Sequence, residues 1–271
     1  CPNNDCDEGY TNIDDICYYQ SDLDVLQQFI DNSTLSINMD MDTDNNGVIE
    51  PLELCSEDIG TGIVAQDWED GRLAGFYCND VGLSGNIPES IGNLTNLEYL
   101  GLQFNAISGT IPEAVGELNN LWLLTLYDNE ITGEIPNSIW NLTGIEKLYL
   151  GYNELSGAIS DNVDNLTNIE ELYLAGNQLS GTVPESICNL PNLTNLWLHQ
   201  NQLCPPFPEC IESMNLEAFY WGAQDTSNCV VEDVYGCTDP EACNYNLEAA
   251  VDDGSCEFCA GGCDGVVTIS N

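Results

Sequence analysis

Positive charge is nearly absent from this sequence of 271 residues. Lys and Arg together number 2, against 46 Asp and Glu, so the formal net charge at pH 7 is −44. Without a cationic surface the chain cannot release counterions from phosphates, which excludes nucleic acid as a partner and disfavours anionic lipid. A chain this acidic repels itself unless cations screen its charge, which indicates surroundings rich in salt or divalent ions.

Long apolar runs and histidine are equally scarce. No apolar run approaches the roughly 20 residues that a membrane-spanning helix needs. His199 is the only histidine, and the sequence has no Ser/His/Asp arrangement, Gly-rich phosphate loop or two-histidine metal motif. These absences predict a protein that is not an enzyme. An initiator Met and a signal-like start are also lacking, so we expect a processed product or a fragment.

The 14 cysteines avoid the middle of the chain. None falls between Cys78 and Cys188, so they cluster at the two ends. An even number in this arrangement predicts disulfides in an oxidising, extracellular or cell-surface location. A zinc site is the alternative, because the spacing of Cys256, Cys259 and Cys263 is tolerable for metal ligands, although that site would be thiolate-only.

A repeat with a period of 24 occupies the middle of the chain. It is regular from Leu97, and a more divergent sixth copy starts at Leu73. In each L-x-x-L-x-L segment the leucines are expected to point inward from a short strand. A recurrent Asn then turns the chain and bonds backbone groups of neighbouring coils. Ile or Val fills the far side of the coil, and Pro favours extended backbone beside it. Such repeats predict a solenoid whose coils stack to bury a shared core.

These residues resemble leucine-rich repeat proteins, and the L-S/T-G-x-I-P segment resembles the plant-type subclass of receptor ectodomains and secreted inhibitors. The resemblance covers about residues 73–216. It implies an α/β repeat fold, a curved right-handed solenoid with a parallel sheet on its concave face. Disulfide-rich caps are expected at both ends.

We therefore divide the chain into five parts. They are a Cys-rich N-terminal segment (1–20), an N-terminal cap with a helix and an ion loop (21–72), six repeats (73–216), a C-terminal cap (217–235) and a Cys/Asp-rich module with a terminal strand (236–271). The last part resembles short modules appended to secreted bacterial surface proteins, and a second cation site there is an open alternative to solvated turns.

The stretch NMDMDTDNNGVIEPLELC, residues 38–55, matches the pattern D-x-[DN]-x-[DN]-G-x5-E. It resembles an EF-hand loop, which implies a calcium ion held by Asp42, Asp44, Asn46, Val48 (through its carbonyl), Glu50 and Glu53. Gly47 permits the sharp turn and Ile49 anchors the loop. Because no second hand is present, we expect calcium to fasten the cap rather than to act as a sensor. An acidic turn without an ion is the alternative. Cys55 could tie the loop to Cys78.

The strand positions on the concave side carry aromatic residues. One column contains Gly101, Thr125, Tyr149, Tyr173 and Trp197, and a further column contains Phe104, Asp128 and Tyr152. Solvent-facing aromatics are not explained by the core and suit protein or glycan binding. Stacking as cross-strand ladders is the alternative. The predicted binding residues are Tyr127, Tyr149, Tyr152, Tyr173 and Trp197.

Sequons of the form N-x-S/T predict glycosylation at Asn32, Asn93, Asn141, Asn165 and Asn192. The sequons at 93, 141 and 165 share one repeat position, so repeat consensus explains them equally well.

The predicted function is an extracellular or cell-surface recognition or adhesion module, non-enzymatic, stabilised by calcium and disulfides, that binds protein or glycan. The alternative is a structural subunit that self-assembles into an extracellular filament or surface layer. In that case the terminal GVVTISN would be donated as a strand to a neighbouring copy. Ice binding is disfavoured because the position before Ile-Pro lacks a regular Thr column.

Overall fold

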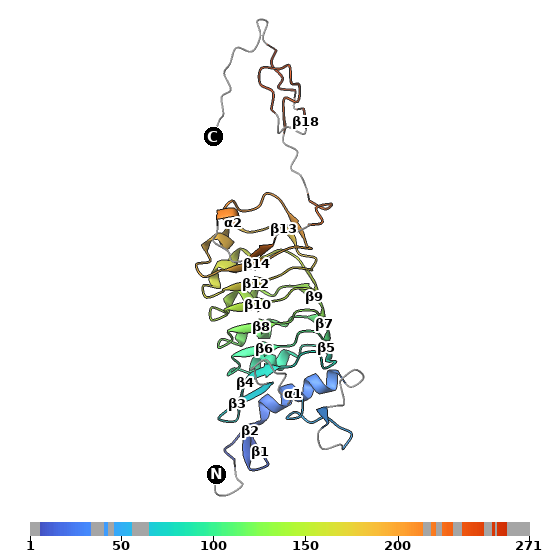
Figure 1. Ribbon diagram of the computed structural model, residues 1–271, viewed down its shortest axis with the longest axis vertical. Coiled ribbons are helices and arrows are strands. Elements are labelled where there is room, and N and C mark those ends of the chain that lie inside the picture. The colour runs from blue at the N-terminus through green and yellow to red at the C-terminus, as the bar shows by residue number, and fades with distance from the viewer. Residues whose placement is uncertain are drawn as a thin grey trace. The chain divides into compact units, whose positions relative to one another are not determined.

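The computed structural model describes residues 6–33, 41–42, 46–55, 65–213, 218–220, 224–229, 235–246, 251–252 and 254–258. The chain forms two units, Cys1–Asn228 and Cys229–Asn271. The first unit holds the solenoid and its N-terminal cap (Figure 1). No helix among the described residues is long and apolar enough to cross a membrane.

The main sheet has eight strands in the order β16-β14-β12-β10-β8-β6-β4-β3. All neighbours are parallel except β3 and β4, and successive repeat strands pair at the same repeat position, as Leu124, Leu148 and Leu172 do. The strands are β3 Gln66–Glu69, β4 Arg72–Tyr77, β6 Tyr99–Gly101, β8 Leu123–Thr125, β10 Lys147–Tyr149, β12 Glu171–Tyr173, β14 Asn195–Trp197 and β16 Ala218–Tyr220. The parallel solenoid sheet is as expected.

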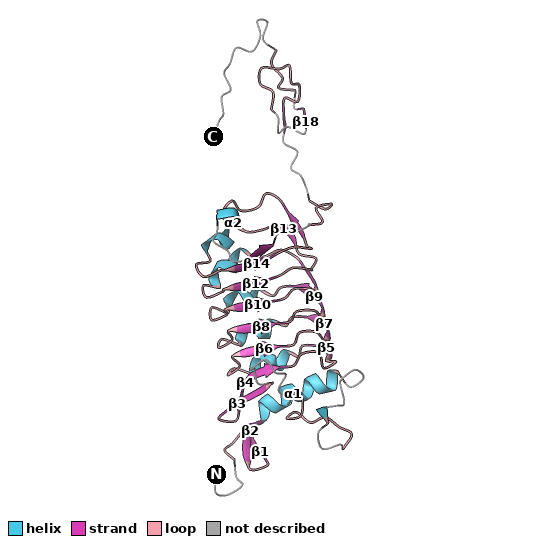
Figure 2. Cartoon of the chain, in the orientation of Figure 1, coloured by secondary structure: helices cyan, strands magenta, loops and turns pink. Residues whose placement is uncertain are grey.

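A second set of short strands lies after the turn of each coil. Four of them form the sheet β11-β9-β7-β5, and β13 pairs with β15. Their bounds are β5 Ser84–Asn86, β7 Ala106–Thr110, β9 Glu130–Glu134, β11 Glu154–Ser156, β13 Ser180–Thr182 and β15 Gln202–Cys204. Figure 2 shows these strands stacked coil upon coil.

One 3-10 helix follows in most coils, directly after the Ile-Pro segment. These helices are η2 Glu89–Asn93, η3 Glu113–Glu117, η4 Asn137–Asn141, η5 Asp161–Asn165 and η6 Glu185–Asn189. Pro88 has the expected extended backbone, with φ −71° and ψ 145°. Ser160 replaces Pro in one coil, keeps φ −65° and ψ 144°, and accepts a 3.2 Å hydrogen bond from the N–H of Asn162.

The core follows the repeat as predicted. Leu121, Leu124 and Leu126 are buried, and so are the Ile or Val residues at 87, 111, 135, 159 and 183. The side chain of Asn129 bridges two coils, because its Oδ1 accepts from the N–H of Ile107 at 3.0 Å and its Nδ2 donates to the carbonyl of Leu102 at 2.9 Å. Asn153 and Asn177 repeat these bonds, so the ladder satisfies backbone groups that the turns would otherwise leave buried and unpaired.

The N-terminal cap covers the first coil. A hairpin of β1 (Tyr10–Ile13) and β2 (Ile16–Tyr19) leads into α1 (Gln20–Asn32), whose Val25, Leu26 and Phe29 are buried. The ring of Phe29 contacts Phe76 of the first repeat strand, with centroids 5.6 Å apart. Burying these apolar residues closes an end of the solenoid that would otherwise expose its core.

An ion pair fastens α1 to β4. Arg72 donates to the carboxylate of Asp22 at 2.8 and 3.2 Å, and the backbone N–H of Leu73 donates to it at 2.9 Å. The carboxylate is fully buried, and the guanidinium lies 4.3 Å above the ring of Tyr19. Asp22 thus has the full set of partners that a buried charge requires.

Disulfides lie at both ends, as expected. The pairs are Cys6–Cys17, Cys55–Cys78, Cys188–Cys210 and, in the second unit, Cys237–Cys256; Cys204, Cys229 and Cys243 are also disulfide-bonded. Cys188–Cys210 joins η6 to α2 (Cys210–Ser213). The pairing of Cys256 rules out its suggested role as a zinc ligand. In the second unit, β17 (Tyr235–Gly236) pairs with β18 (Val251–Asp252).

Candidate functional site

The register of the main sheet assembles part of the predicted binding set. Tyr149, Tyr173 and Trp197 occupy the same position on the adjacent strands β10, β12 and β14. Their rings touch in sequence, with centroid distances of 6.4 Å for Tyr149–Tyr173 and 5.1 Å for Tyr173–Trp197. All three side chains are partly exposed, so this column forms an aromatic strip on the outer surface of the sheet.

Residues just after the strands widen the strip. Tyr127 lies 5.5 Å from Tyr173 and 5.2 Å from Tyr152, measured between ring centroids. Phe104 extends the group on the other side, 5.4 Å from Tyr127. The structure therefore brings all five predicted residues together and adds Phe104. We call these six the aromatic cluster: Phe104, Tyr127, Tyr149, Tyr152, Tyr173 and Trp197.

Two members of the cluster sit on unusual backbone. One residue per coil after the main strand has positive φ, and the row comprises Asp80, Phe104, Asp128, Tyr152, Gly176 and Gln200. Phe104 has φ 59° and Tyr152 has φ 52°, a region that bulky side chains rarely adopt. Both side chains are also exposed, at 47% for Phe104 and 37% for Tyr152. Neither the positive φ nor the exposure to solvent favours an aromatic ring at these two positions.

Glycines make room for the rings. A Cβ at Gly151 would lie 2.4 Å from ring atoms of Tyr173, and one at Gly176 would lie 2.9 Å from the ring of Tyr152. These rings therefore lie against bare backbone. Glycine at positions 151 and 176, where the repeat could carry a side chain, leaves the space that these two rings occupy.

A carboxylate borders the cluster and is held by two neighbours. Lys147 donates to Oε1 of Glu171 at 2.7 Å, and the hydroxyl of Tyr149 donates to Oε2 at 2.5 Å. Burial alone would raise the pKa of Glu171, but the hydrogen bonds from Lys147 and Tyr149 outweigh it and lower the pKa. Glu171 is thus ionised at neutral pH, and the cluster carries a fixed ion pair at its edge.

Three tyrosine hydroxyls of the cluster, those of Tyr127, Tyr149 and Tyr173, stay protonated at neutral pH. Burial raises the pKa of Tyr149 and Tyr173 well above the usual range, and nearby Glu171 and Tyr127 respectively raise it further. Burial also raises the pKa of Tyr127, with smaller contributions from the charges of Tyr152 and Asp128. The face consequently presents neutral hydroxyl groups that can donate and accept hydrogen bonds.

The cluster encloses a shallow cavity of about 370 Å³. Its walls are Gln103, Phe104, Tyr127, Tyr149, Glu171, Tyr173 and Trp197. An apolar lining with a few convergent polar groups is the composition expected of a ligand site. Phe104, Lys147 and Glu171 are absent from the predicted set. The repeat could have indicated them, since Phe104 shares a column with Tyr152, and Lys147 and Glu171 are one period apart.

The predicted calcium ligands lie in the N-terminal cap, except Asp44, which is outside the described residues. The carboxylate of Asp42 accepts from the N–H groups of Asn46 at 3.1 Å and Gly47 at 2.8 Å. Gly47 has the expected turn conformation, with φ 89°, and Ile49 is buried as predicted. Glu53 accepts from the N–H of Glu50 at 3.2 Å. Within the described part of the chain, no three acidic, Cys or His side chains converge as a metal site.

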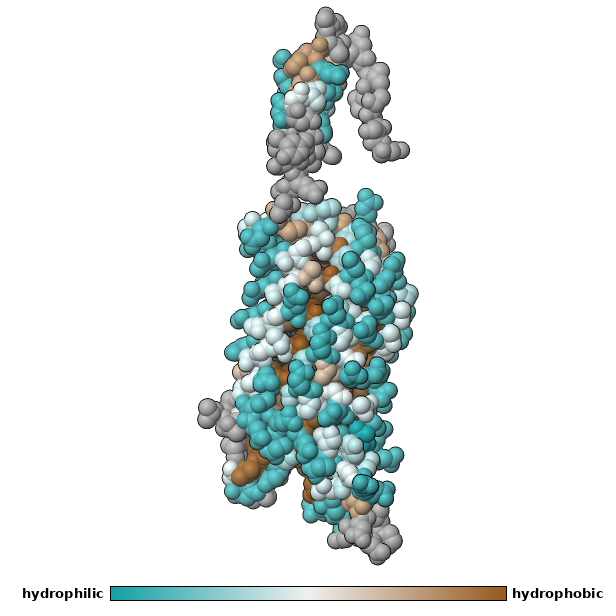
Figure 3. All heavy atoms as spheres, turned by 180° about the vertical axis from the view of Figure 1, so that it is seen from behind, coloured by the Kyte–Doolittle hydropathy of each residue, from teal (hydrophilic) through white to brown (hydrophobic). Residues whose placement is uncertain are grey.

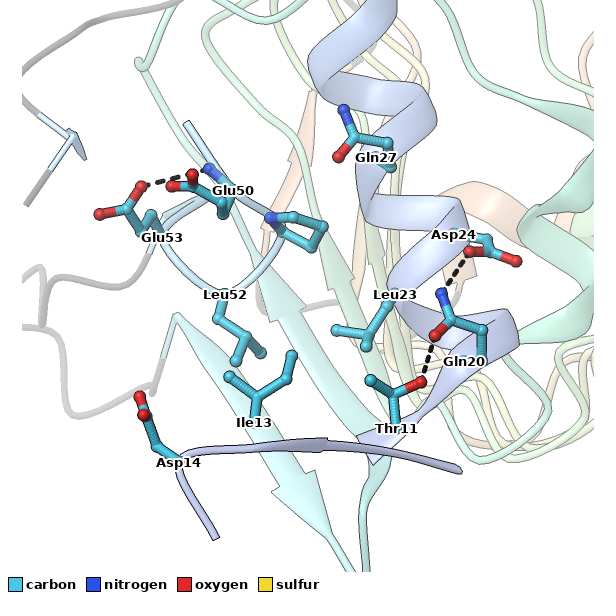
Figure 4. A pocket seen from close by; sticks show the side chains of 11 residues that line it. Thr11, Ile13, Asp14, Gln20, Leu23, Asp24, Gln27, Glu50, Leu52 and Glu53 are labelled. Carbon is cyan, nitrogen blue, oxygen red and sulfur yellow. Dashed lines mark hydrogen bonds between the residues drawn. The ribbon is translucent and has the colours of Figure 1, made fainter. Parts of the chain in front are cut away.

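A larger cleft adjoins this loop. It has a volume of about 720 Å³ and lies between the β1–β2 hairpin, α1 and residues 50–53. Figure 4 shows Ile13, Leu23 and Leu52 gathered in it, with Glu50 and Glu53 together at one end. On the opposite side, Gln20 bonds Thr11 and donates to Asp24 at 2.7 Å. The cleft lies where these three parts of the cap meet, and its apolar side chains extend the packing between the parts.

The predicted sequon asparagines are all exposed. Asn93, Asn141 and Asn165 are the last residues of η2, η4 and η5, so they recur at one place on three of the coils.

Figure 3, which shows the molecule from behind, has a mostly hydrophilic surface with narrow hydrophobic stripes.

Known proteins share the repeat region. A family model described as a leucine-rich repeat region matches residues 77–229. Three solved structures are similar in fold. The ectodomain of the Arabidopsis receptor kinase HAESA, in complex with an extended IDA peptide hormone, is 34% identical, with a TM-score of 0.53 over 54% of this chain and 24% of that one.

The second structure is the ectodomain of the receptor kinase SOBIR1 from Arabidopsis thaliana, 26% identical, with a TM-score of 0.54 over 69% of this chain and 98% of that one. The third is a plant ice-binding protein, 25% identical, with a TM-score of 0.56 over 69% and 57%. This chain spans about a quarter of the HAESA ectodomain it resembles. No curated protein matches the sequence. The family match covers more than half of the chain and agrees with the stacked coils, their leucine core and their asparagine ladder, so the chain belongs to the leucine-rich repeat family.

Proposed function

We propose that this protein is an extracellular, non-enzymatic recognition module that binds a protein or glycan through the aromatic cluster. One observation carries the proposal. Phe104 and Tyr152 expose large rings from backbone positions where glycine would be favoured. Strained, exposed aromatics are costly to the fold and are typical of positions kept for function.

The alternative is that the rings only stabilise the sheet as a cross-strand ladder. The contacts among Tyr149, Tyr173 and Trp197 are compatible with that role. It does not account for Phe104, which is 47% exposed and whose ring contacts Tyr127, outside that ladder. Gly176 occupies the same row, so the repeat can carry glycine, which is unstrained at positive φ, at this position.

The similar structures support an extracellular binding role. HAESA was solved with a peptide hormone ligand, and disulfides at both ends of the present chain suit an oxidising compartment. A net charge of −44 excludes strongly anionic partners on electrostatic grounds.

Peptide and glycan arrays probed with the intact protein test the proposal. We expect binding by the wild type that is lost on Tyr173→Ala, because Tyr173 contacts four members of the cluster. Phe104→Ala should weaken the same interaction. The matched control is Phe258→Ala in the second unit, which removes another exposed phenylalanine, 64% accessible. Equal loss in the control, or binding that ignores Tyr173, would refute the assignment.

We also propose that the loop at residues 42–53 binds one calcium ion that fastens the cap. The orientation of Asp42 toward the N–H groups of the turn and the positive φ of Gly47 support it. Calcium should raise the melting temperature of the wild type, and Glu53→Gln should remove most of that increase. Glu117→Gln, an exposed glutamate of η3, is the control. A wild-type melting temperature that is indifferent to millimolar calcium would contradict this proposal.

Self-assembly through the terminal strand remains the alternative function. The strand GVVTISN lies outside the described residues, so its support is still the sequence pattern. Negative-stain microscopy with and without a chelator separates the two functions. Filaments that dissolve on chelation support polymerisation, whereas a monodisperse monomer that binds through Tyr173 supports recognition.

A further inference from the structure

We propose that Asp128, with the rings of Phe104, Tyr127 and Tyr152, forms a subsite for a basic side chain, Lys or Arg, of a polypeptide ligand. The inference rests on the proposed function and specifies the chemistry of the partner. It is carried by the position of one carboxylate among three aromatic rings.

The backbone places these residues on three successive coils. The N–H of Phe104 donates to the carbonyl of Tyr127 at 3.0 Å, and the N–H of Asp128 donates to the carbonyl of Gly151 at 3.0 Å. Phe104, Asp128 and Tyr152 have φ values of 59°, 57° and 52°. Because the same backbone conformation repeats in stacked coils, their side chains leave the backbone in the same direction. Asp128 therefore occupies the position between Phe104 and Tyr152 in this row.

Tyr127 closes the subsite on the inner side. Its ring contacts both Phe104, at 5.4 Å, and Tyr152, at 5.2 Å. The charge of Asp128 also acts on the hydroxyl of Tyr127, where it contributes to the raised pKa of that group. The acid and the three rings thus form one local arrangement at the exposed edge of the aromatic cluster.

The chain supplies no cationic side chain for this acid. It contains 2 Lys and Arg in all. Arg72 is bound to Asp22, and Lys147 is bound to Glu171. Among the described residues, no ion pair or hydrogen bond is made to the carboxylate of Asp128, which is exposed. A cation that neutralises Asp128 has to come from solution or from a ligand.

The same molecule shows how such groups hold a cation. The guanidinium of Arg72 lies 4.3 Å above the ring of Tyr19 while it bonds the carboxylate of Asp22. The ring attracts the cation through its negative face, and the acid fixes its position. Asp128 and its rings offer the same two kinds of group, a carboxylate and aromatic faces.

Ring geometry favours a basic side chain over a sugar. Phe104 and Tyr127 are inclined at 75°, and Tyr127 and Tyr152 at 65°. Rings at such angles form walls rather than the flat platform on which a pyranose stacks. A linear side chain that has an apolar stem and a cationic end fits between walls and reaches the acid.

Immobilised hexapeptides with random flanks and a fixed Arg, Lys, citrulline or norleucine provide the probe. The wild type should prefer Arg or Lys at physiological ionic strength. For the best sequence, replacement of Arg by the neutral isostere citrulline should weaken binding roughly tenfold. In Asp128→Asn the same replacement should change binding less than about twofold. Asn tolerates positive φ, so this variant should fold, and its melting temperature verifies that.

Asp161→Asn is the matched control, because it removes one exposed charge from η5 and lowers the overall attraction of the protein equally. It should keep the tenfold preference for Arg. The subsite is wrong if Asp161→Asn loses the preference as Asp128→Asn does, if citrulline binds as well as Arg, or if no peptide binds. Glycan binding that depends on Tyr173 but not on Asp128 would overturn the subsite and leave the proposed function intact. Failure of both arrays would overturn both.

Discussion

Gly151 faces the ring of Tyr173 so closely that a Cβ on the glycine would lie 2.4 Å from two ring carbons and 2.9 Å from the carbonyl of Ala175. Gly151→Ala should therefore displace Tyr173, weaken ligand binding and lower the free energy of unfolding by about 1–3 kcal/mol. Gly144→Ala is the control, since its nearest contact would be 3.5 Å. Denaturant unfolding and binding assays compare the two variants, and equal effects would argue against close packing at Gly151.

Phe104 offers a test of the strain in the left-handed row. Phe104→Gly and Phe104→Ala both lose the ring, but only alanine keeps a Cβ at φ 59°. The glycine variant should be more stable by roughly 0.5–1 kcal/mol, the reverse of the usual order. The same pair of changes at Gln103, which does not have positive φ, should show the usual order. If alanine is the more stable replacement at both positions, the row is not strained.

The partly buried tyrosine hydroxyls predict a loss of stability in alkali. Tyr149 and Tyr173 have pKa values raised in the folded state above the value of about 10 in an unfolded chain. The contribution of these two tyrosines to the free energy of unfolding is fully present below about pH 10, the unfolded pKa. It is lost as the pH rises through the folded pKa. Tyrosinate absorbance should lag behind that of the unfolded chain and then rise with unfolding. Tyr173→Phe should lower the amplitude of the late phase. A titration that coincides with that of the unfolded chain would contradict this.

The two ion pairs should differ in their contribution to stability. Arg72→Ala leaves the fully buried carboxylate of Asp22 without its cation, which should lower the free energy of unfolding by about 3 kcal/mol. Lys147→Ala breaks a pair whose side chains are 34% and 21% exposed, and should cost less than about 1 kcal/mol. Urea unfolding of both variants measures the contrast, and similar losses would contradict it.

Glycosylation should be uneven if the protein is made by a host that modifies such sites. Asn93, Asn141 and Asn165 end exposed 3-10 helices. In contrast, the side-chain amide of Asn32 donates to the carbonyl of Asn86, and that of Asn192 to Thr167, each at 2.8 Å. We expect higher occupancy at the first three sites. Mass spectrometry after enzymatic deglycosylation measures occupancy, and equal values at all five would refute the prediction.

The repeat determines inward and outward positions, which is why the leucine core, the asparagine ladder and the column Tyr149–Tyr173–Trp197 could be predicted. Leu148 pairs with Leu172 one period later, and every outward column follows from that pairing. The left-handed row could not be predicted in this way, because periodicity carries no information on the sign of φ. Tyr152 and Phe104 adopt a conformation that their side chains disfavour, and the stacked turns impose it.

Arg72 and Lys147 also allow trypsin digestion to report whether the solenoid is folded. Trypsin cleaves after Lys and Arg, and these are the two such residues in the chain. Both lie in strands of the main sheet, β4 and β10, and both are held in ion pairs. A protease needs extended, accessible backbone, which paired strands do not supply. The folded chain should therefore resist digestion, while an opened solenoid should yield the fragments 1–72, 73–147 and 148–271, held together wherever disulfides bridge them. The order of the two cleavages would report which end of the solenoid opens first. Cleavage after Arg72 before Lys147 indicates the N-terminal end.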